Sequence, residues 1–220
     1  MVSGVLFDMD GVLFDTERLA GEADVEAAAE MGYALPDDVR YSLMGLGADA
    51  VRETICSAMG PGFDYARFIT RMRAHMAREI EAHGLPKKPG VDEALAWLQV
   101  QGLPVAVASS SRYTTICGHL QRAGLQGAFS AIVSGDRVEH AKPAPDIFLG
   151  AAAALGLPPQ RCLAVEDSYN GVRSAAAAGC ITVMVPDLLP ATEEMRALCA
   201  AVLPSLHALP GFVAQCNAGV

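Results

Sequence analysis

Two aspartates at alternate positions follow the first apolar run of the chain, and their spacing suggests chemistry. Val5–Phe7 has the composition of a buried strand, and Asp8 and Asp10 come directly after it. Since residues two apart in a strand point to the same side, both carboxylates are predicted to face one cavity. Like charges this close are costly unless a divalent cation or a shared proton neutralises one of them. Either arrangement prepares a carboxylate for nucleophilic or acid–base work.

A lone aspartate pair is more often a solvated turn than a site, so the interpretation depends on later segments. The first of them is Ser109–Ser111, which follows the apolar run Val105–Ala108. Its hydroxyls and successive backbone N–H groups, near the start of a helix, form an arrangement that binds anions. In isolation such a loop is more often a helix cap.

A lysine and a second acid pair complete the set. Lys142 stands before Pro143, which restricts the lysine backbone, and Glu166 and Asp167 follow the apolar run Leu163–Val165. Taken singly, a lysine is usually solvated and an acid pair is usually a turn or a helix cap. Together, these segments place two acid pairs, a hydroxyl loop and a cation at the ends of predicted strands. Oxygen ligands without a His or Cys cluster favour Mg²⁺ over zinc.

The elements that must position these residues alternate between short strands and helices. Helical patterns end at Gly102, Gly156 and Gly179, which suit left-handed caps. Short, continuously apolar runs between them are typical of parallel strands covered on both faces. These runs are Val5–Phe7, Val105–Ala108, Ala131–Val133, Leu163–Val165 and Ile181–Val185, with Ala201–Val202–Leu203 as a candidate edge strand. The alternation predicts an α/β fold with a doubly wound parallel sheet, which binds ligands beyond the carboxyl ends of its strands.

A long helical segment interrupts this alternation after the first strand. Residues 15–86 have the pattern of successive helices. The chain leaves this segment through the Pro- and Gly-rich stretch Gly84–Gly90, which suits a hinge. The predicted organisation is therefore a catalytic α/β core of residues 1–14 and 87–220, with residues 15–86 as an inserted helical cap. An insertion that emerges beside Asp8 and Asp10 would overhang them as a lid.

Composition restricts the class of protein and its partners. The chain has 220 residues, of which 52% are apolar, enough for a sizeable core. Its formal net charge of −9 argues against nucleic acid or an anionic membrane as the main partner. The six cysteines include no C-x-x-C pair and are interpreted as buried thiols in a reducing cytosol. No signal peptide or membrane span is predicted. We expect a cytoplasmic protein whose oligomeric state is open, with a monomer slightly favoured.

Nearly the whole chain resembles the haloacid dehalogenase-like superfamily of phosphohydrolases, in the branch of β-phosphoglucomutase and the small sugar-phosphate phosphatases. The segments that carry the resemblance are Phe7–Val12 with Asp15–Glu17, Ala108–Ser111, Lys142–Asp146 and Val165–Gly171. True dehalogenases of the superfamily lack the second aspartate, so Asp10 points to phosphoryl transfer. The resemblance implies a Rossmann-like core with a helical cap, Mg²⁺ as cofactor and a small phosphorylated metabolite as substrate.

The resemblance also implies catalytic roles at the first acid pair. Asp8 resembles the nucleophile that attacks phosphorus and becomes an aspartyl phosphate, and Asp10 resembles the general acid and base. Mg²⁺ would be held by the Asp8 carboxylate, the Asp10 backbone carbonyl and Asp167, with Glu166 orienting a metal-bound water.

The same resemblance assigns the phosphoryl oxygens to donors on two other segments. Ser109, Ser110 and Lys142 would hold these oxygens, so that charge in the transition state meets preorganised donors. The bond between Lys142 and Pro143 is often cis in this family.

Departures from the mutase pattern favour a phosphatase. The mutases carry a His shortly after Asp15, and residues 17–20 contain none. The phosphate-binding arginine of their specificity loop falls on Ala48, although Gly45 lies in a matching loop. Arg67, Arg71, His75 and Arg78 recur at helical spacing and could form a cationic face toward the substrate, but such residues are more often a solvated helix surface. Arg71 falls near a cap lysine of the mutases and is the candidate substrate contact among them. The alternatives are a β-phosphoglucomutase-type isomerase and a non-catalytic protein that binds a phosphorylated metabolite.

Overall fold

The computed structural model describes residues 1–43 and 48–219 of the chain. They form two compact units. One unit, the core, comprises Met1–Asp15 and Lys87–Val220, and the other, the cap, comprises Thr16–Pro86. The cap is inserted after the first strand of the core, so two chain segments connect the units.

The core is built on a six-stranded sheet in the order β3-β2-β1-β4-β5-β6, in which all neighbouring strands are parallel. Chain order reverses direction at β1, as in doubly wound folds, and ligands bind at such switch points. The strands are β1 Gly4–Phe7, β2 Val105–Ser109, β3 Ala131–Ser134, β4 Cys162–Glu166, β5 Ile181–Met184 and β6 Ala201–Val202.

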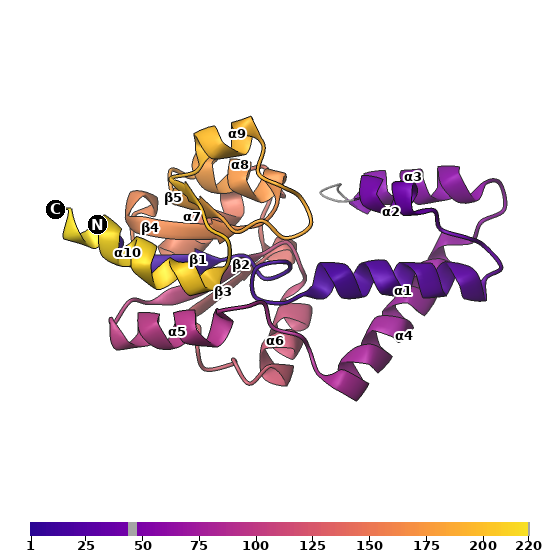
Figure 1. Cartoon of the computed structure of the whole chain (residues 1–220), viewed down its shortest axis with the longest axis horizontal. Helices are drawn as coiled ribbons and strands as arrows, with labels where there is room; N and C mark the ends of the chain where they lie inside the picture. Colours follow the sequence, from indigo (N-terminus) through magenta and orange to yellow (C-terminus); the bar gives the residue numbers. More distant parts are fainter. Residues whose placement is uncertain (44–47, 220) are drawn as a thin grey trace. The chain divides into compact units, whose positions relative to one another are not determined.

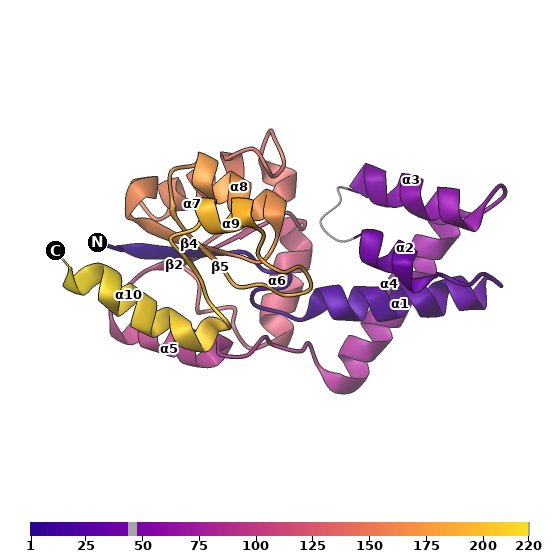
Figure 2. The same ribbon diagram turned by 45° about the horizontal axis from the view of Figure 1, so that its top comes forward.

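Helices cover both faces of this sheet (Figures 1 and 2). The helices α7 and α8 lie on one face, and α5 and α10 lie on the other. The helices of the core are α5 Val91–Val100, α6 Tyr113–Arg122, α7 Asp146–Ala154, α8 Tyr169–Ala177, α9 Glu193–Leu198 and α10 Leu209–Ala218. Short 3₁₀ turns occupy Gly135–Arg137, Pro159–Arg161 and Leu206–Ala208.

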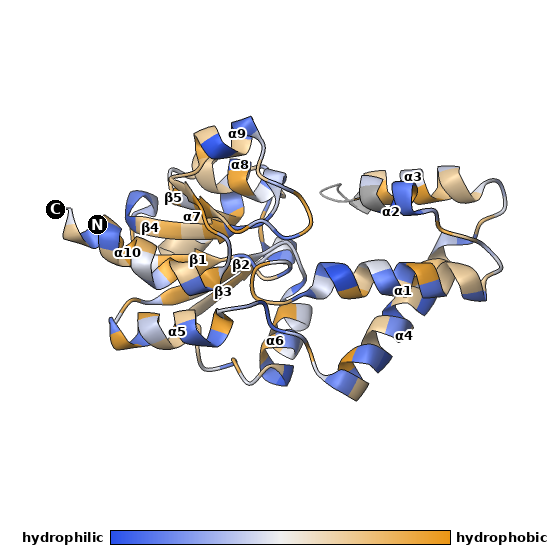
Figure 3. Cartoon of the chain, viewed as in Figure 1, coloured by the Kyte–Doolittle hydropathy of each residue, from blue (hydrophilic) through white to orange (hydrophobic). Residues whose placement is uncertain are grey.

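Burial explains why the strand sequences are continuously apolar. Every residue of β1, β2 and β4 is buried, because helices pack on both faces, and the sheet is coloured mainly as hydrophobic in Figure 3. On the α7 face, Leu6 and Ala164 pack with Phe148 in one apolar cluster. The central strands therefore have little freedom to shift, and the residues at their carboxyl ends are held by a rigid support.

The cap is a group of helices with its own apolar core. Its helices are α1 Thr16–Glu30, α2 Asp37–Ser42, α3 Ala48–Met59 and α4 Tyr65–His83. Phe68 of α4 is fully buried and packs with Ala27 of α1 and Ile55 of α3. The carboxylate of Asp64 caps α4 by accepting a hydrogen bond from the amide of Arg67.

The expected fold class and strands are confirmed. Each predicted strand is present, and Gly102, Gly156 and Gly179 have positive φ angles at helix ends. The bond between Lys142 and Pro143 is cis. The expectation that all cysteines are buried is wrong, because only Cys162 is buried and the other five are partly exposed; all six are free thiols. Among the described residues, the helices fall short of the length and hydrophobicity needed to cross a bilayer.

Candidate active site

A buried lysine joins two acidic strand ends in the core. The ammonium Nζ of Lys142 lies 2.5 Å from Oδ1 of Asp8 and 2.6 Å from Oε1 of Glu166. It also donates to the carbonyl oxygen of Ala108, at 3.1 Å. Asp8 directly follows β1, Glu166 is the last residue of β4, and Ala108 is the next-to-last residue of β2. The three strands are adjacent in the sheet, so a single cation can reach all of these partners. The predicted convergence of Asp8, Lys142 and Glu166 is therefore present in the geometry.

The second oxygen of Glu166 is held by the loop that follows β4. Oε2 accepts hydrogen bonds from the amides of Asp167 and Ser168 and from the Ser168 hydroxyl, at 3.1–3.2 Å. Glu166 is fully buried, and Gly171 lies against it. A Cβ built on Gly171 would lie 1.9 Å from the Glu166 carboxyl carbon. The sequence did not predict this contact. Its only local signal is the pair Asn170–Gly171, which by itself indicates no more than a turn or a helix cap.

Asp10 and the serine loop also meet. The hydroxyl of Ser111 donates to Oδ2 of Asp10 at 2.9 Å, and the amide of Ser111 donates to the hydroxyl oxygen of Ser109 at 3.1 Å. Ser109 is buried, whereas Ser110 is exposed. Sequence reasoning grouped the serines as one anion-binding loop and assigned phosphate contacts to Ser109 and Ser110. It did not single out Ser111 as the partner of Asp10.

The electrostatics of Asp8 and Lys142 are dominated by burial and by each other. Burial raises the pKa of Asp8 to about 8; Lys142 opposes this shift, and the charges of Glu166 and Asp10 add to it. Burial works to lower the pKa of Lys142, but the Asp8 and Glu166 carboxylates outweigh it and raise that pKa. Lys142 therefore remains a cation between these carboxylates.

The acidic groups are arranged in a way that suits a divalent cation. Asp8, Glu166 and Asp167 each offer an oxygen, and these atoms lie within 4.8 Å of one another. Gly11 approaches Asp167 so closely that a Cβ would lie 2.3 Å from its Oδ2. This group, found among the described residues, consists of carboxylates alone, and a compact set of hard carboxylate oxygens matches the preference of Mg²⁺.

The two candidate substrate contacts of the cap are Arg71 and Gly45. Arg71 pairs with Glu30, which also lies 3.0 Å from Nε2 of His75 and 3.9 Å from a guanidinium nitrogen of Arg78. Three basic side chains of α4, those of Arg71, His75 and Arg78, thus surround one carboxylate of α1 within the cap. Gly45 lies outside the described residues, so the structure gives no contact for it.

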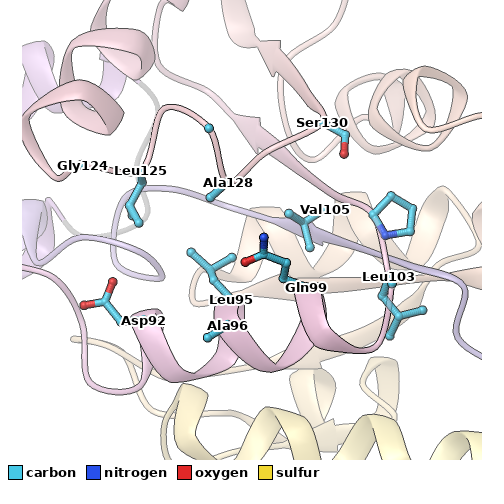
Figure 4. A pocket seen from close by; sticks show the side chains of 13 residues that line it. Asp92, Leu95, Ala96, Gln99, Leu103, Val105, Gly124, Leu125, Ala128 and Ser130 are labelled. Carbon is cyan, nitrogen blue, oxygen red and sulfur yellow. The ribbon is translucent and has the colours of Figure 1, made fainter.

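A shallow hollow elsewhere on the core has no part in this arrangement. It has a volume of about 650 Å³ and lies beside α5, near the beginnings of β2 and β3 (Figure 4). Leu95, Gln99 and Leu125 are among its lining residues. None of the acids, serines or lysine described above lines it, and the starts of the strands are the opposite end of the sheet from Asp8.

Comparison with known proteins identifies the class of protein. The family described as haloacid dehalogenase-like hydrolase matches residues 2–179. The chain belongs to this family, which confirms the resemblance drawn from the four sequence segments.

Individual relatives are named as phosphatases. The chain is 33% identical over 193 residues to hexitol phosphatase B of Escherichia coli (strain K12), with 84% of each chain covered. It is 32% identical over 178 residues to the phosphorylated carbohydrates phosphatase of Thermotoga maritima, covering 81% of this chain and 82% of the relative. Family and relatives together make the chain a phosphoric monoester hydrolase.

A solved structure supports the fold over nearly the full length. CbbY from Rhodobacter sphaeroides, solved as a mutant in complex with xylulose-(1,5)bisphosphate, superposes with a TM-score of 0.79 at 26% identity. The match covers 95% of this chain and 96% of CbbY.

Proposed function

We propose that this protein is a Mg²⁺-dependent phosphatase of a small, sugar-like phosphorylated metabolite, and that it acts through an aspartyl phosphate on Asp8. The observation that carries the proposal is the contact of 2.5 Å between Lys142 Nζ and Asp8 Oδ1 at the carboxyl ends of buried parallel strands. A carboxylate fixed by a permanent cation is oriented for attack on an anionic group, which a carboxylate in solution would repel.

In the proposed reaction, Asp8 acts first as a nucleophile. Its second oxygen, Oδ2, attacks phosphorus, the bond from phosphorus to the ester oxygen breaks, and Asp10 gives its proton to the departing alkoxide. Asp10 then accepts a proton from water as the water oxygen attacks phosphorus, which releases inorganic phosphate and restores the Asp8 carboxylate. The hydrogen bond from Ser111 supports Asp10 in this role by fixing the orientation of its carboxyl group.

The charge of the phosphoryl group is met by Lys142 and by the loop that begins at Ser109. The ammonium of Lys142 is held by two carboxylates before substrate arrives, so the ammonium needs little reorganisation during the reaction. Ser109 is buried and follows Ala108, whose carbonyl accepts a hydrogen bond from Lys142, and we assign the serine loop to the phosphoryl oxygens.

The metal site of the proposal consists of the Asp8 carboxylate, the backbone carbonyl of Asp10 and Asp167. When bound there, Mg²⁺ would supply positive charge that keeps Asp8 ionised and offsets the charge of the phosphate. Glu166 orients Lys142 through one oxygen and the Asp167–Ser168 backbone through the other. We therefore assign Glu166 to positioning the site, together with any water on the metal.

The substrate class rests on the relatives. One is named for hexitol phosphates and another for phosphorylated carbohydrates. A polyol or sugar monophosphate is therefore the first class to test, and simple hydrolysis is favoured over the mutase reaction.

A phosphate-release screen with Mg²⁺ tests the proposal. The panel contains hexitol phosphates, sugar phosphates, nucleotides, phosphoglycolate and xylulose bisphosphate, with the Asp8→Asn variant purified in parallel. We expect release of inorganic phosphate from at least one sugar or polyol phosphate, and none with the variant. Conversion of β-glucose 1-phosphate to glucose 6-phosphate without phosphate release would instead show a mutase. Ligand binding without turnover would show a binding protein.

A further inference from the structure

A second, partly buried ion cluster lies in the core, where the connections to the cap leave and return. Nζ of Lys88 lies 2.6 Å from Oδ1 of Asp187 and 3.3 Å from Oδ1 of Asp15. The side chain of Asp187 is 7% exposed and that of Lys88 is 19% exposed. Asp15 ends the outgoing connection, Lys88 lies in the returning one, and Asp187 lies in the loop after β5. We call these residues the Lys88 clasp.

Backbone hydrogen bonds extend the clasp to the turn that carries Asp10. The amide of Lys88 donates to the carbonyl of Leu13 at 3.0 Å, and the amide of Gly11 donates to the carbonyl of Phe14 at 2.9 Å. The backbone of Phe14 also pairs with those of Asp10 and Lys87 in isolated β-bridges. The turn after Asp10 and the returning connection are thus paired along the backbone, and the Lys88 side chain joins this pair to the loop after β5.

The charges of the clasp make Lys88 its central member. Oδ2 of Asp187 is buried without a hydrogen-bond partner in the described part of the chain, so this carboxylate depends on Lys88 for compensation. Burial lowers the pKa of Lys88, but the hydrogen bond and charge of Asp187, with those of Asp15, outweigh burial and raise that pKa. A neutral side chain at position 88 would leave a buried carboxylate uncompensated.

We propose that Lys88 is a positioning residue, which fixes the turn after Asp10 to both connections and to the loop after β5. The catalytic part of this inference rests on the proposed function, because the position of Asp10 matters only if Asp10 transfers a proton. The structural part does not, since it concerns only the order of the backbone.

The test compares Lys88→Met with Lys87→Met. Lys87 is adjacent and also pairs with an aspartate, Asp92, at 2.6 Å, but this partner is largely exposed. Amide hydrogen exchange by NMR is followed at Gly11 and Lys88, with the amide of Asp8, which bonds to Val165 in the sheet, as internal reference. In Lys88→Met we expect the amides at positions 11 and 88 to exchange at least about tenfold faster than in the wild type. The exchange rate of the Asp8 amide should not change. Lys87→Met keeps the wild-type rates.

Turnover of p-nitrophenyl phosphate gives a second readout. A displacement of about 1 Å in a catalytic group can cost about 10²-fold, so we expect kcat of Lys88→Met to fall ten- to a hundredfold with a smaller change in KM. Lys88→Arg, which can donate to both carboxylates, restores most of kcat. Wild-type exchange at both amides overturns the proposal, and so does wild-type kcat despite faster exchange.

Two further variants keep the outcome interpretable. If Lys88→Met does not fold, Asp187→Asn removes one partner at nearly constant volume and is held to the same criteria. If Asp8→Asn retains full turnover, the proposed function fails, and hydrogen exchange alone then decides whether the Lys88 clasp orders the turn.

Discussion

Nζ of Lys142 lies 2.5 Å from Oδ1 of Asp8, although the two residues are 134 positions apart in the chain. The contact brings a buried cation to a carboxylate whose burial favours the protonated form. The cis peptide bond at Lys142–Pro143 precedes the segment that leads into α7. This pair is the centre of the proposed site.

Replacement of Asp8 by Asn removes the proposed nucleophile at almost constant size. We expect phosphate release to fall by about 10⁴-fold or more, as for loss of other enzyme nucleophiles, with the fold retained by circular dichroism. Asp38→Asn, at an exposed position in α2, is the matched control and keeps full activity. Full turnover by the Asp8 variant, free of contaminating phosphatase, would show that another residue attacks phosphorus.

Replacement of Lys142 by Met leaves two buried carboxylates, Asp8 and Glu166, without their shared cation. Breaking a buried ion pair typically costs about 3–5 kcal/mol, so we expect a loss of this order in the free energy of unfolding. Activity should be lost as well. Urea denaturation of Lys142→Met and of Lys87→Met separates the buried pair from an exposed one, since exposed pairs contribute about 0–1 kcal/mol. Equal stability of the two variants would contradict the buried ion cluster.

Replacement of Gly171 by Ala tests the close approach of α8 to Glu166. The added Cβ would lie 1.9 Å from the Glu166 carboxyl carbon, so Glu166 must move and release Lys142 or the loop amides. We expect a more than tenfold loss of kcat and a destabilisation of about 1–3 kcal/mol, as for other overpacked sites. Gly211→Ala in α10 is the control, because its Cβ meets no described atom within 4 Å. Helix propensity predicts that Gly211→Ala is neutral or stabilising.

Asp24 in α1 makes the stability of the protein depend on pH. Burial, aided by the charge of Glu17, raises its pKa from 3.8 to about 7. Between these values the unfolded chain loses the proton first, so the contribution of Asp24 to the free energy of unfolding falls as pH rises from about 4 to 7 and stays low above that range. We expect Asp24→Asn to be more stable than wild type at pH 8 by at least about 1 kcal/mol and to lose this advantage near pH 4. Urea denaturation at both pH values measures the difference, and a gain that is equal at both would contradict the assignment.

Removal of divalent cations tests the metal site apart from the fold. Treatment with EDTA should abolish phosphate release, and added Mg²⁺ should restore it. In Asp167→Asn the Mg²⁺ concentration for half-maximal activity should rise tenfold or more, since loss of groups around a metal typically costs 10–100-fold in affinity. Asp136→Asn, a carboxylate that instead accepts from Ser134 and Tyr113, should keep the wild-type requirement. Activity that is indifferent to EDTA would remove Mg²⁺ from the proposal.

The sequence alone predicted the strands and the strand-end chemistry. Continuous apolar runs between glycine-terminated helices identified the parallel sheet, because strands covered on both faces have no need for polar residues. That sheet implied that Asp8, the serine loop, Lys142 and Glu166 meet at its carboxyl edge. The contacts of Lys142 with Asp8 and Glu166 agree with that expectation.

The contacts that depend on side-chain direction were not predictable. From the sequence, Arg71 was a candidate substrate contact, and nothing in the sequence indicated its ion pair with Glu30, which is 41 positions away. It likewise gave no sign that Ser111 binds Asp10 or that Lys88 meets Asp187. Each of these pairs joins elements whose relative rotation is set by packing, and hydrophobic periodicity does not specify that rotation.

Local patterning thus determined which segments become strands and helices and which polar residues end them, since these depend on neighbours in the chain. Only the tertiary structure decided which oxygen accepts from which donor, because such a bond forms or fails within about half an ångström. Tertiary structure alone therefore shows that Asp8 and Glu166 share Lys142. It alone also shows that Asp15 and Asp187 share Lys88.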